Sequence, residues 1–252
     1  MGYLVVEGPH DVELACRLLG ASANFDRVRE FTALEDTFRK LVPTAFPHKG
    51  DLLKRVPVPV FLQNETHGVA VQCAEGDSNL ANCLLGTLEV LTPSNFDAIG
   101  ALLDADSSDT PLDRHKKLVS ELAAIDLAWP TEPGTIQEGA PRTGIYVLPD
   151  NVTSGTLEDL LVECGDLVYP DHMKLAREFI EAAMPHCPKR DFKPLHKAAG
   201  QKKALVGAVA TLLKPGRAIQ NSIQDNAWLG ADAQKIARVA QLRTFFADLF
   251  SV

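Results

Sequence analysis

The sequence has few cysteines, and none is placed to form a recognisable pair. The five cysteines are scattered through 252 residues and include no C-x-x-C pair. An odd number without paired spacing argues against a disulfide framework, and the missing C-x-x-C pair argues against a zinc knuckle. We therefore expect buried or idle thiols at Cys16, Cys73, Cys83, Cys164 and Cys187.

Long apolar runs are missing as well. None approaches the roughly 20 residues that a membrane-spanning helix needs. The start, Met1-Gly2-Tyr3, leads directly into an apolar stretch without the features of a signal peptide. These absences predict a soluble, cytoplasmic protein with no membrane partner.

Positive charge is scarce overall and concentrated in one segment. The formal net charge of −8 disfavours indiscriminate nucleic-acid binding. Residues 186–217 differ, because they contain eight cationic residues and only one acid, Asp191, which gives the segment a charge of +7. Such a basic run is usually a solvated surface, but it could also hold a phosphate backbone. The candidate nucleic-acid-binding residues are Lys189, Arg190, Lys193, Lys197 and Lys202.

What the sequence does contain is an alternation of strand and helix patterns. This alternation predicts an α/β protein with a mainly parallel central sheet flanked by helices, plus a helical C-terminal region. We expect the core to comprise residues 1–165 and the helical region, packed on it, residues 166–252. The expected strands are residues 3–6, 58–62, 69–72, 99–103 and 144–148, of which the second and third form a hairpin. The expected helices include residues 12–19, 31–42, 80–90, 111–125, 173–183, 201–213 and 231–250, and residues 129–143 are expected to be an exposed loop.

The central expected strand, residues 99–103, runs straight into Asp104-Ala105-Asp106. Strands that are apolar on both faces lie in the middle of parallel sheets, and ligands bind outside their carboxyl ends. If the strand continues that far, alternation puts Asp104 and Asp106 on one side, where they can share a hard cation such as Mg²⁺. Without a cation, the two charges raise one another's pKa. The alternative is a solvated loop or helix cap, and the following Ser107-Ser108 predicts a solvated loop.

Acids also stand beside two other expected elements. Glu7 follows the first strand, and Gly8-Pro9 then punctuates the chain before Asp11, which is able to cap the next helix. Glu158 lies in the first turn of the helix after the last strand, where a negative charge is favourable by itself. Glu7 thus stands at the carboxyl end of a strand, as Asp104 does.

Together these segments resemble the Toprim domain, the Rossmann-like catalytic module of type IA and type II topoisomerases, bacterial primases and OLD-family nucleases. The resemblance extends to an uncharacterised family of small Toprim-like bacterial proteins and covers nearly the whole chain. An aromatic-rich helix of that family is replaced here by residues 205–210, so no role of that helix carries over. The motifs that carry the resemblance are Val6-Glu7-Gly8-Pro9-His10-Asp11, Leu103-Asp104-Ala105-Asp106, residues 144–151, Gly155-Thr156-Leu157-Glu158-Asp159, Lys203-Ala204 and Pro215-Gly216.

The resemblance implies roles for particular residues. Glu7 would act as general acid or base in phosphodiester chemistry, and Lys203 would stabilise the transition state. Its position beside Lys202 alone favours a solvated helix face for Lys203. Two metals suit hydrolysis, because one activates the attacking water while the other stabilises the leaving oxygen. The implied ligands of Mg²⁺ or Mn²⁺ are Glu7, Asp11, Asp104, Asp106 and Glu158.

We therefore expect Mg²⁺-dependent hydrolysis of nucleic acid, and two alternatives stay open. One is a non-catalytic module that binds a metal or nucleotide. The protein could form a homo-oligomer in any of these cases. The other is a haloacid-dehalogenase-type phosphatase, whose strand also ends in Asp-x-Asp. That pattern wants Thr or Val where this chain has Ser108, and its later Gly-Asp-x-x-x-Asp would fall on Gly165-Asp166 with Pro170 in the last place. A topoisomerase would need a supported tyrosine nucleophile, and a primase a zinc-binding segment.

Overall fold

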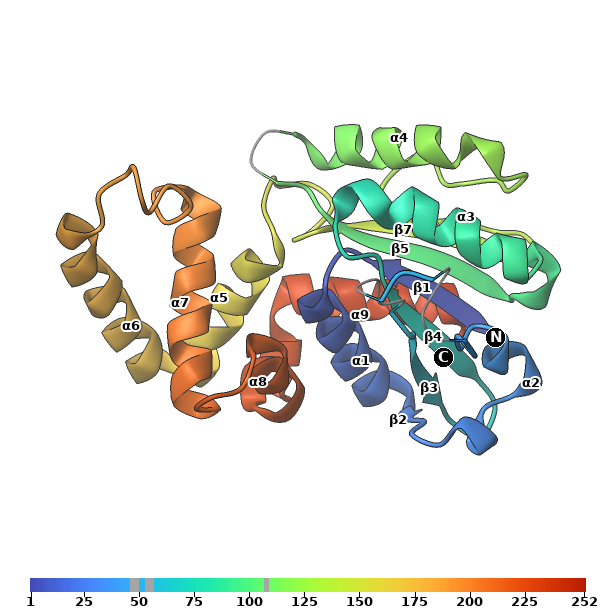
Figure 1. The fold of residues 1–252 in the computed structure, drawn as a ribbon, viewed down its shortest axis with the longest axis horizontal. Helices are drawn as coiled ribbons and strands as arrows, with labels where there is room; N and C mark the ends of the chain where they lie inside the picture. The colour runs from blue at the N-terminus through green and yellow to red at the C-terminus, as the bar shows by residue number, and fades with distance from the viewer. Residues whose placement is uncertain (46–49, 53–56, 107–108) are drawn as a thin grey trace.

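The protein is built around one seven-stranded sheet, seen in a computed structural model that describes residues 1–252 except 46–49, 53–56 and 107–108 (Figure 1). The strand order is β2-β3-β4-β1-β5-β7-β6. The four central strands are parallel, and the edge strands are antiparallel to their neighbours. The α/β class and the mainly parallel centre are thus confirmed. The strands are β1 (Gly2–Val6), β2 (Asp26–Arg27), β3 (Val60–Gln63), β4 (Gly68–Cys73), β5 (Ala98–Asp104), β6 (Ile136–Gln137) and β7 (Arg142–Leu148).

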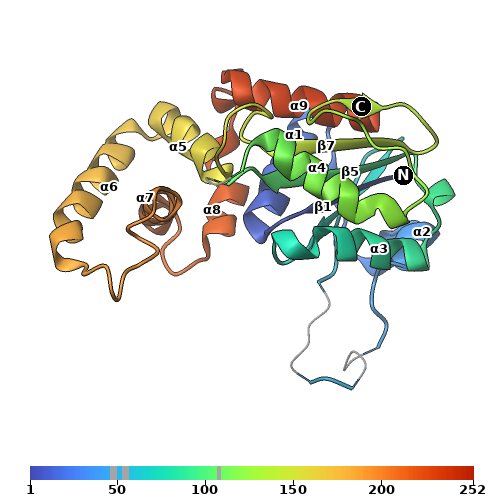
Figure 2. The same cartoon turned by 90° about the horizontal axis from the view of Figure 1, so that it is seen from above.

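The central strands are apolar on both faces because helices cover both. Leu4 and Leu102 pack on one face with α1 (Pro9–Ala23) and α9 (Ala237–Phe250). Tyr3 and Ile99 pack on the other with α3 (Leu80–Val90), α4 (Pro111–Glu121) and the short α2 (Asp36–Arg39). Figure 2 shows the sheet between these two helical layers. Such burial on both sides leaves the strand ends as the place for polar chemistry.

The remaining helices lie beside the sheet at the carboxyl ends of its parallel strands (Figure 1). They are α5 (Leu157–Val168), α6 (Pro170–Ala183), α7 (Ala198–Leu213) and α8 (Ile219–Asp225). Helix α7 contacts α5, α6 and α8, while α8 also contacts α1. The chain then returns to the sheet as α9, so the end of the predicted helical region lies against the strands. The division after residue 165 itself stays a prediction.

Two glycines let α9 lie close to the sheet. Gly100 of β5 and Gly144 of β7 are partners in the parallel register. A Cβ atom on Gly100 would lie 2.6 Å from Leu249, and one on Gly144 would lie 2.9 Å from Phe245. The absence of side chains at these two positions therefore determines how closely the last helix packs.

The first helix begins earlier than predicted. Its N-cap is Gly8, Pro9 occupies the first helical position, and Asp11 is the third helical residue instead of the cap. Asp11 still serves the helix start, because its Oδ2 accepts a hydrogen bond from the Gly8 N–H at 2.8 Å. A proline is tolerated at this position because its missing N–H needs no intrahelical partner. The helix also continues through Gly20 to Ala23.

Other expected elements were partly wrong. The helix over residues 31–42 is a 3₁₀ turn, Phe31–Ala33, followed by the single-turn α2, because Leu34 between them is extended with ψ of 142°. The loop of residues 129–143 contains the short edge strand β6, and α8 was not expected at all. The hairpin of β3 and β4 and the helix over residues 80–90 are confirmed. The predicted solvated loop at Ser107 and Ser108 lies outside the described residues.

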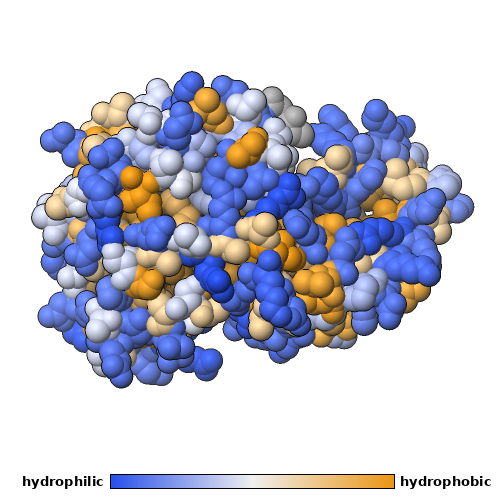
Figure 3. All heavy atoms as spheres, turned by 180° about the vertical axis from the view of Figure 1, so that it is seen from behind, coloured by the Kyte–Doolittle hydropathy of each residue, from blue (hydrophilic) through white to orange (hydrophobic). Residues whose placement is uncertain are grey.

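One face of the molecule is mainly polar (Figure 3). Seen from behind, the molecule shows mainly hydrophilic side chains with apolar ones in small separate patches (Figure 3). Within the described part of the chain, no helix has the length and apolarity to cross a membrane.

Candidate functional site

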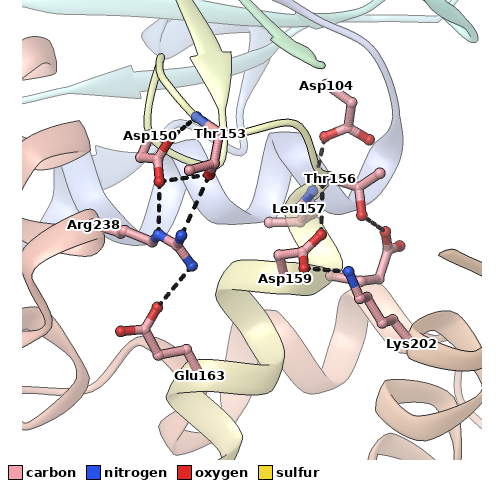
Figure 4. Close-up of polar contacts among 10 residues, drawn as sticks. Asp104, Asp150, Thr153, Thr156, Leu157, Asp159, Glu163, Lys202 and Arg238 are labelled. Carbon is pink, nitrogen blue, oxygen red and sulfur yellow. Dashed lines mark hydrogen bonds and ion pairs between the residues drawn. The ribbon is translucent and has the colours of Figure 1, made fainter. Parts of the chain in front are cut away.

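Three distant segments meet where β1 and β5 end. Glu7 follows β1, and its Oε2 accepts a hydrogen bond from the backbone N–H of Asp104, the last residue of β5, at 2.8 Å. Asp104 Oδ1 in turn accepts from the Leu157 N–H at the start of α5, also at 2.8 Å (Figure 4). Two carboxylate hydrogen bonds thus connect β1 to β5 and β5 to α5, between residues 97 and 53 positions apart in the sequence.

Four of the predicted metal ligands line one cavity of about 690 Å³. Glu7 and Asp104 come from strand ends, Asp11 from the first turn of α1, and Glu158 from the first turn of α5. Asp11 and Glu158 are buried, with 6% and 5% of their surface exposed. The cavity wall also includes Lys203, His10, Cys73, Glu75, Gly8, Pro9, Pro57, Gly76 and Leu157.

In each of these four carboxylates, one of the two oxygens accepts a hydrogen bond from the protein. Glu7, Asp11 and Asp104 accept from backbone N–H groups, and Glu158 Oε2 accepts from the Thr156 hydroxyl at 2.9 Å. Within the described residues, no group donates a hydrogen bond to the second oxygen of any of the four. The cavity therefore has four anchored carboxylates, each with one oxygen unpaired by the protein.

Burial and mutual repulsion make these acids hard to ionise together. Burial raises the pKa of Asp104 well above its usual value, and the charges of Asp11, Glu7 and Glu158 raise it further. Burial, followed by the charge of Glu7, raises the pKa of Asp11 to about 7. The pKa of Glu7 is also raised, mainly by burial, although the hydrogen bond from Asp104 and the charge of Arg114 oppose the shift. A divalent cation would relieve this crowding of like charge.

Asp106 does not lie with Asp104 in the way that strand alternation would place it. Strand β5 ends at Asp104, and Asp106 has a φ of 60°, so the alternation stops before it. Its N–H bonds to the Gly155 carbonyl at 2.9 Å, and its side chain is not part of the cavity wall. Asp106 is still near enough for its charge to raise the pKa of Glu7.

The two neighbouring lysines of α7 behave differently. Lys203 lines the acidic cavity, and no ion pair to it is formed by the described residues. Lys202 forms an ion pair with Asp159 near the start of α5 (Figure 4). The pair ties α7 to α5, so Lys202 is already engaged, whereas Lys203 is available to a ligand in the cavity.

The other predicted nucleic-acid-binding residues lie together in the segment that precedes α7. Lys189, Arg190, Lys193 and Lys197 are all exposed. Of these, Arg190 contacts Asp191 at 3.9 Å, and the three lysines form no ion pair with any described residue. Their charges are therefore presented to solvent.

The sequence analysis did not predict a role for Arg114 at the site. It is 5% exposed, and its Nε donates to the Asp104 carbonyl at 3.1 Å while its Nη1 contacts Asp77 Oδ2 at 3.2 Å. It thus holds the end of β5 from the side of α4. The available signal was its place on the buried stripe of α4, four residues before Leu118, where an arginine needs a partner.

Glu75 and Cys73 were also missed as cavity residues. Cys73 is the last residue of β4 and Glu75 lies two residues after it, and β4 lies beside β1 in the sheet. Their strand was predicted, but its position next to β1 was not. The carboxyl end of β4 therefore could not be assigned to the site.

The donors fit a hard cation better than a soft one. Mg²⁺ and Mn²⁺ prefer oxygen ligands, and the four unpaired oxygens are carboxylate oxygens. No three His, Cys, Asp or Glu side chains in the described parts of the chain are arranged to hold a metal ion as they stand. Repelling carboxylates stay apart until a cation lies between them, so binding would require these side chains to rotate towards the metal.

Comparisons with known proteins place the chain without assigning an activity. The model of a protein family of unknown function, DUF3226, matches residues 1–251. No curated protein matches the chain. The crystal structure of the hypothetical protein PH0156 from Pyrococcus horikoshii OT3 is similar, with a TM-score of 0.59 and 15% sequence identity over 98% of this chain and 94% of that one. At this identity, the likeness supports the fold alone.

Proposed function

This chain belongs to the protein family of unknown function DUF3226, and we propose that it is a divalent-metal-dependent phosphodiesterase that hydrolyses nucleic acid at a Toprim-like carboxylate site. The observation that carries the proposal is the convergence of Glu7, Asp11, Asp104 and Glu158 on one cavity. Their unpaired oxygens can surround Mg²⁺ or Mn²⁺, and Asp106 is near enough for its charge to act on Glu7. When bound, the metal would activate water and neutralise charge on the phosphate.

Glu7 is the residue suited to move a proton. Its carboxylate is held against the Asp104 N–H, which fixes its direction, and burial raises its pKa above the usual value. A general acid or base works best when its pKa lies near the working pH. Glu7 would therefore take a proton from the attacking water or give one to the leaving oxygen.

Lys203 supplies positive charge at the edge of the same cavity. Its ammonium group makes no ion pair with the described residues, and the side chain lines the same cavity as the acids. A phosphodiester bound among four carboxylates needs such a cation to offset repulsion of its non-bridging oxygens. We assign Lys203 this role.

The phosphatase alternative finds less support. Asp166, the first acid of its later Gly-Asp-x-x-x-Asp, lies in α5 and pairs with Arg177 at 2.7 Å instead of lining the cavity. Asp106, the second acid of the required Asp-x-Asp, is also absent from the cavity wall. A non-catalytic binding module would use the same acids to hold a metal without turnover.

The proposal is tested by incubating the purified protein with single-stranded DNA, double-stranded DNA and RNA, each with Mg²⁺ or Mn²⁺. We expect metal-dependent cleavage that Glu7→Gln lowers by roughly 10²- to 10⁴-fold. The matched control is Asp126→Asn, which neutralises an exposed acid outside the cavity and should leave the rate unchanged.

The other outcomes separate the alternatives. Metal binding without cleavage of any substrate would favour the binding module. Hydrolysis of p-nitrophenyl phosphate that is lost in Asp104→Asn but kept in Glu7→Gln would favour the phosphatase.

A further inference from the structure

An exposed aromatic side chain interrupts the basic segment before α7. Phe192 keeps 43% of its surface exposed, although a phenylalanine is ordinarily buried. It follows Arg190 and Asp191, which contact one another at 3.9 Å, and precedes Lys193; all three are exposed as well. A flat apolar ring flanked by cations is the combination that single-stranded nucleic acids bind, with bases stacked on the ring and phosphates near the cations.

The segment is folded and does not depend on a partner for its shape. The N–H groups of Asp191 and Phe192 both bond to the Pro188 carbonyl, and the Leu195 N–H bonds to the Phe192 carbonyl at 3.0 Å. The chain then folds back on the first turn of α7, where a Cβ atom on Gly200 would lie 1.9 Å from the Pro194 carbonyl oxygen. The backbone that carries the ring and the charges is therefore held by its own hydrogen bonds, which lowers the backbone entropy lost on binding.

The segment also leads directly to the acidic cavity. Helix α7 begins at Ala198, and Lys203 of the same helix lines the cavity. Five residues of helix span about 7.5 Å at 1.5 Å per residue. Figure 1 shows the connection from α6 entering α7 at the upper end of the helix. A strand bound on the segment would thus lie within a few nucleotides of Lys203.

We infer that residues 188–197 form a platform for single-stranded nucleic acid, in which Phe192 stacks on a base while Arg190, Lys193 and Lys197 contact the phosphates. A duplex keeps its bases stacked inside, so only an unpaired base can reach the ring. The platform would deliver a single strand to the acidic cavity. That last step rests on the proposed function, whereas binding itself does not.

Binding is tested by fluorescence anisotropy with a labelled 12-residue oligothymidylate in EDTA, where metal-dependent hydrolysis cannot occur. Replacing Phe192 with alanine should raise the Kd by roughly 5- to 100-fold, the range for loss of one base–aromatic contact. Phe192→Trp retains a stacking surface and should restore binding. The matched control is Phe179→Ala, which removes another exposed phenylalanine, 65% exposed on α6, and should change Kd by less than about twofold.

The charge contacts have a separate signature. Replacing Lys193 and Lys197 with glutamine should reduce the slope of log K against log salt by about 0.7 for each lost phosphate contact. A duplex of the same length and polyglutamate, which offers charge without bases, should bind more weakly than the oligothymidylate. Equal binding of polyglutamate would mean an acidic protein surface as partner and would overturn the platform.

The platform and the proposed hydrolysis fail in different ways. The platform is wrong if the oligothymidylate does not bind, or if its Kd is the same for Phe192→Ala and the unaltered protein. It stands, and hydrolysis fails, if binding depends on Phe192 but no metal yields product. Conversely, metal-dependent cleavage that needs Glu7 but has an unchanged KM in Phe192→Ala would support hydrolysis without the platform.

Discussion

Asp11 offers the sharpest test of the crowded carboxylates. Burial and the neighbouring charge of Glu7 raise its pKa from 3.8 to about 7. Each pKa unit corresponds to 1.36 kcal/mol, so holding Asp11 ionised in the metal-free protein costs about 4 kcal/mol. Asp11→Asn removes the charge at nearly constant volume, and its amide oxygen still accepts from the Gly8 N–H.

The pH dependence has a definite sign. Because the folded pKa lies above the unfolded one, the folded state holds more protons between about pH 4 and pH 7. The stability of the metal-free protein therefore falls as pH rises through that window, and the full cost is present above pH 7. Asp11→Asn should gain about 2–4 kcal/mol in free energy of unfolding at pH 8 and less than about 1 kcal/mol at pH 4, where the folded Asp11 carboxyl is protonated.

Urea unfolding in EDTA, followed by circular dichroism from pH 4 to pH 8, measures this difference. Asp126→Asn is the control and should stay within about 0.5 kcal/mol of the unaltered protein, because Asp126 is exposed. Excess Mg²⁺ should stabilise the unaltered protein more than Asp11→Asn. A gain that is equal at pH 4 and pH 8, or no gain at pH 8, would refute the reasoning about crowded charges.

Three further changes probe other parts of the molecule. Gly144→Ala should destabilise the protein by about 1–3 kcal/mol because its Cβ would meet Phe245. Gly86→Ala is the control: its Cβ would point into open space in α3, so it should stabilise the protein by about 0.5–1 kcal/mol. Equal urea midpoints for the two variants would contradict the close approach of α9. His115 is 1% exposed, and no described residue forms a hydrogen bond with either ring nitrogen. Burial lowers its pKa, so the unfolded chain binds a proton more readily than the folded one. The stability of the protein should therefore fall as pH drops below about 6.5. His115→Leu should remove much of that loss in urea titrations at pH 5 and pH 7.5, and an unchanged pH dependence would count against it. Lys203→Met should lower the rate of metal-dependent cleavage by at least tenfold while leaving metal affinity within about twofold, and a rate equal to that of the unaltered protein would place Lys203 outside the reaction.

Much of the α/β core follows from local patterns. The doubly buried runs before Glu7 and Asp104 predicted parallel strands, and the carboxyl ends of such strands meet at one edge of a sheet. That rule was sufficient to expect Glu7 and Asp104 close together, and the hydrogen bond from the Asp104 N–H to Glu7 confirms their proximity. What the acids do there stays a prediction.

What the patterns could not provide was tertiary in origin. The position of Asp106 depends on a backbone turn with positive φ, which Asp adopts without a distinct sequence signal. Glu75 joins the cavity only because β4 pairs with β1, and the strand order is set by packing across the sheet. Lys203 reaches the cavity because α7 packs on α5, so a local reading could not distinguish it from Lys202.

Crystals soaked in Mn²⁺ would test the proposed centre most directly, through the anomalous scattering of the metal. We expect at least one peak in the cavity, within about 2.5 Å of carboxylate oxygens from Glu7, Asp11, Asp104 or Glu158, and no such peak in Asp104→Asn crystals. A fully soaked crystal with no peak among these oxygens, or with Mn²⁺ bound equally in Asp104→Asn, would contradict the metal site and the chemistry proposed for it.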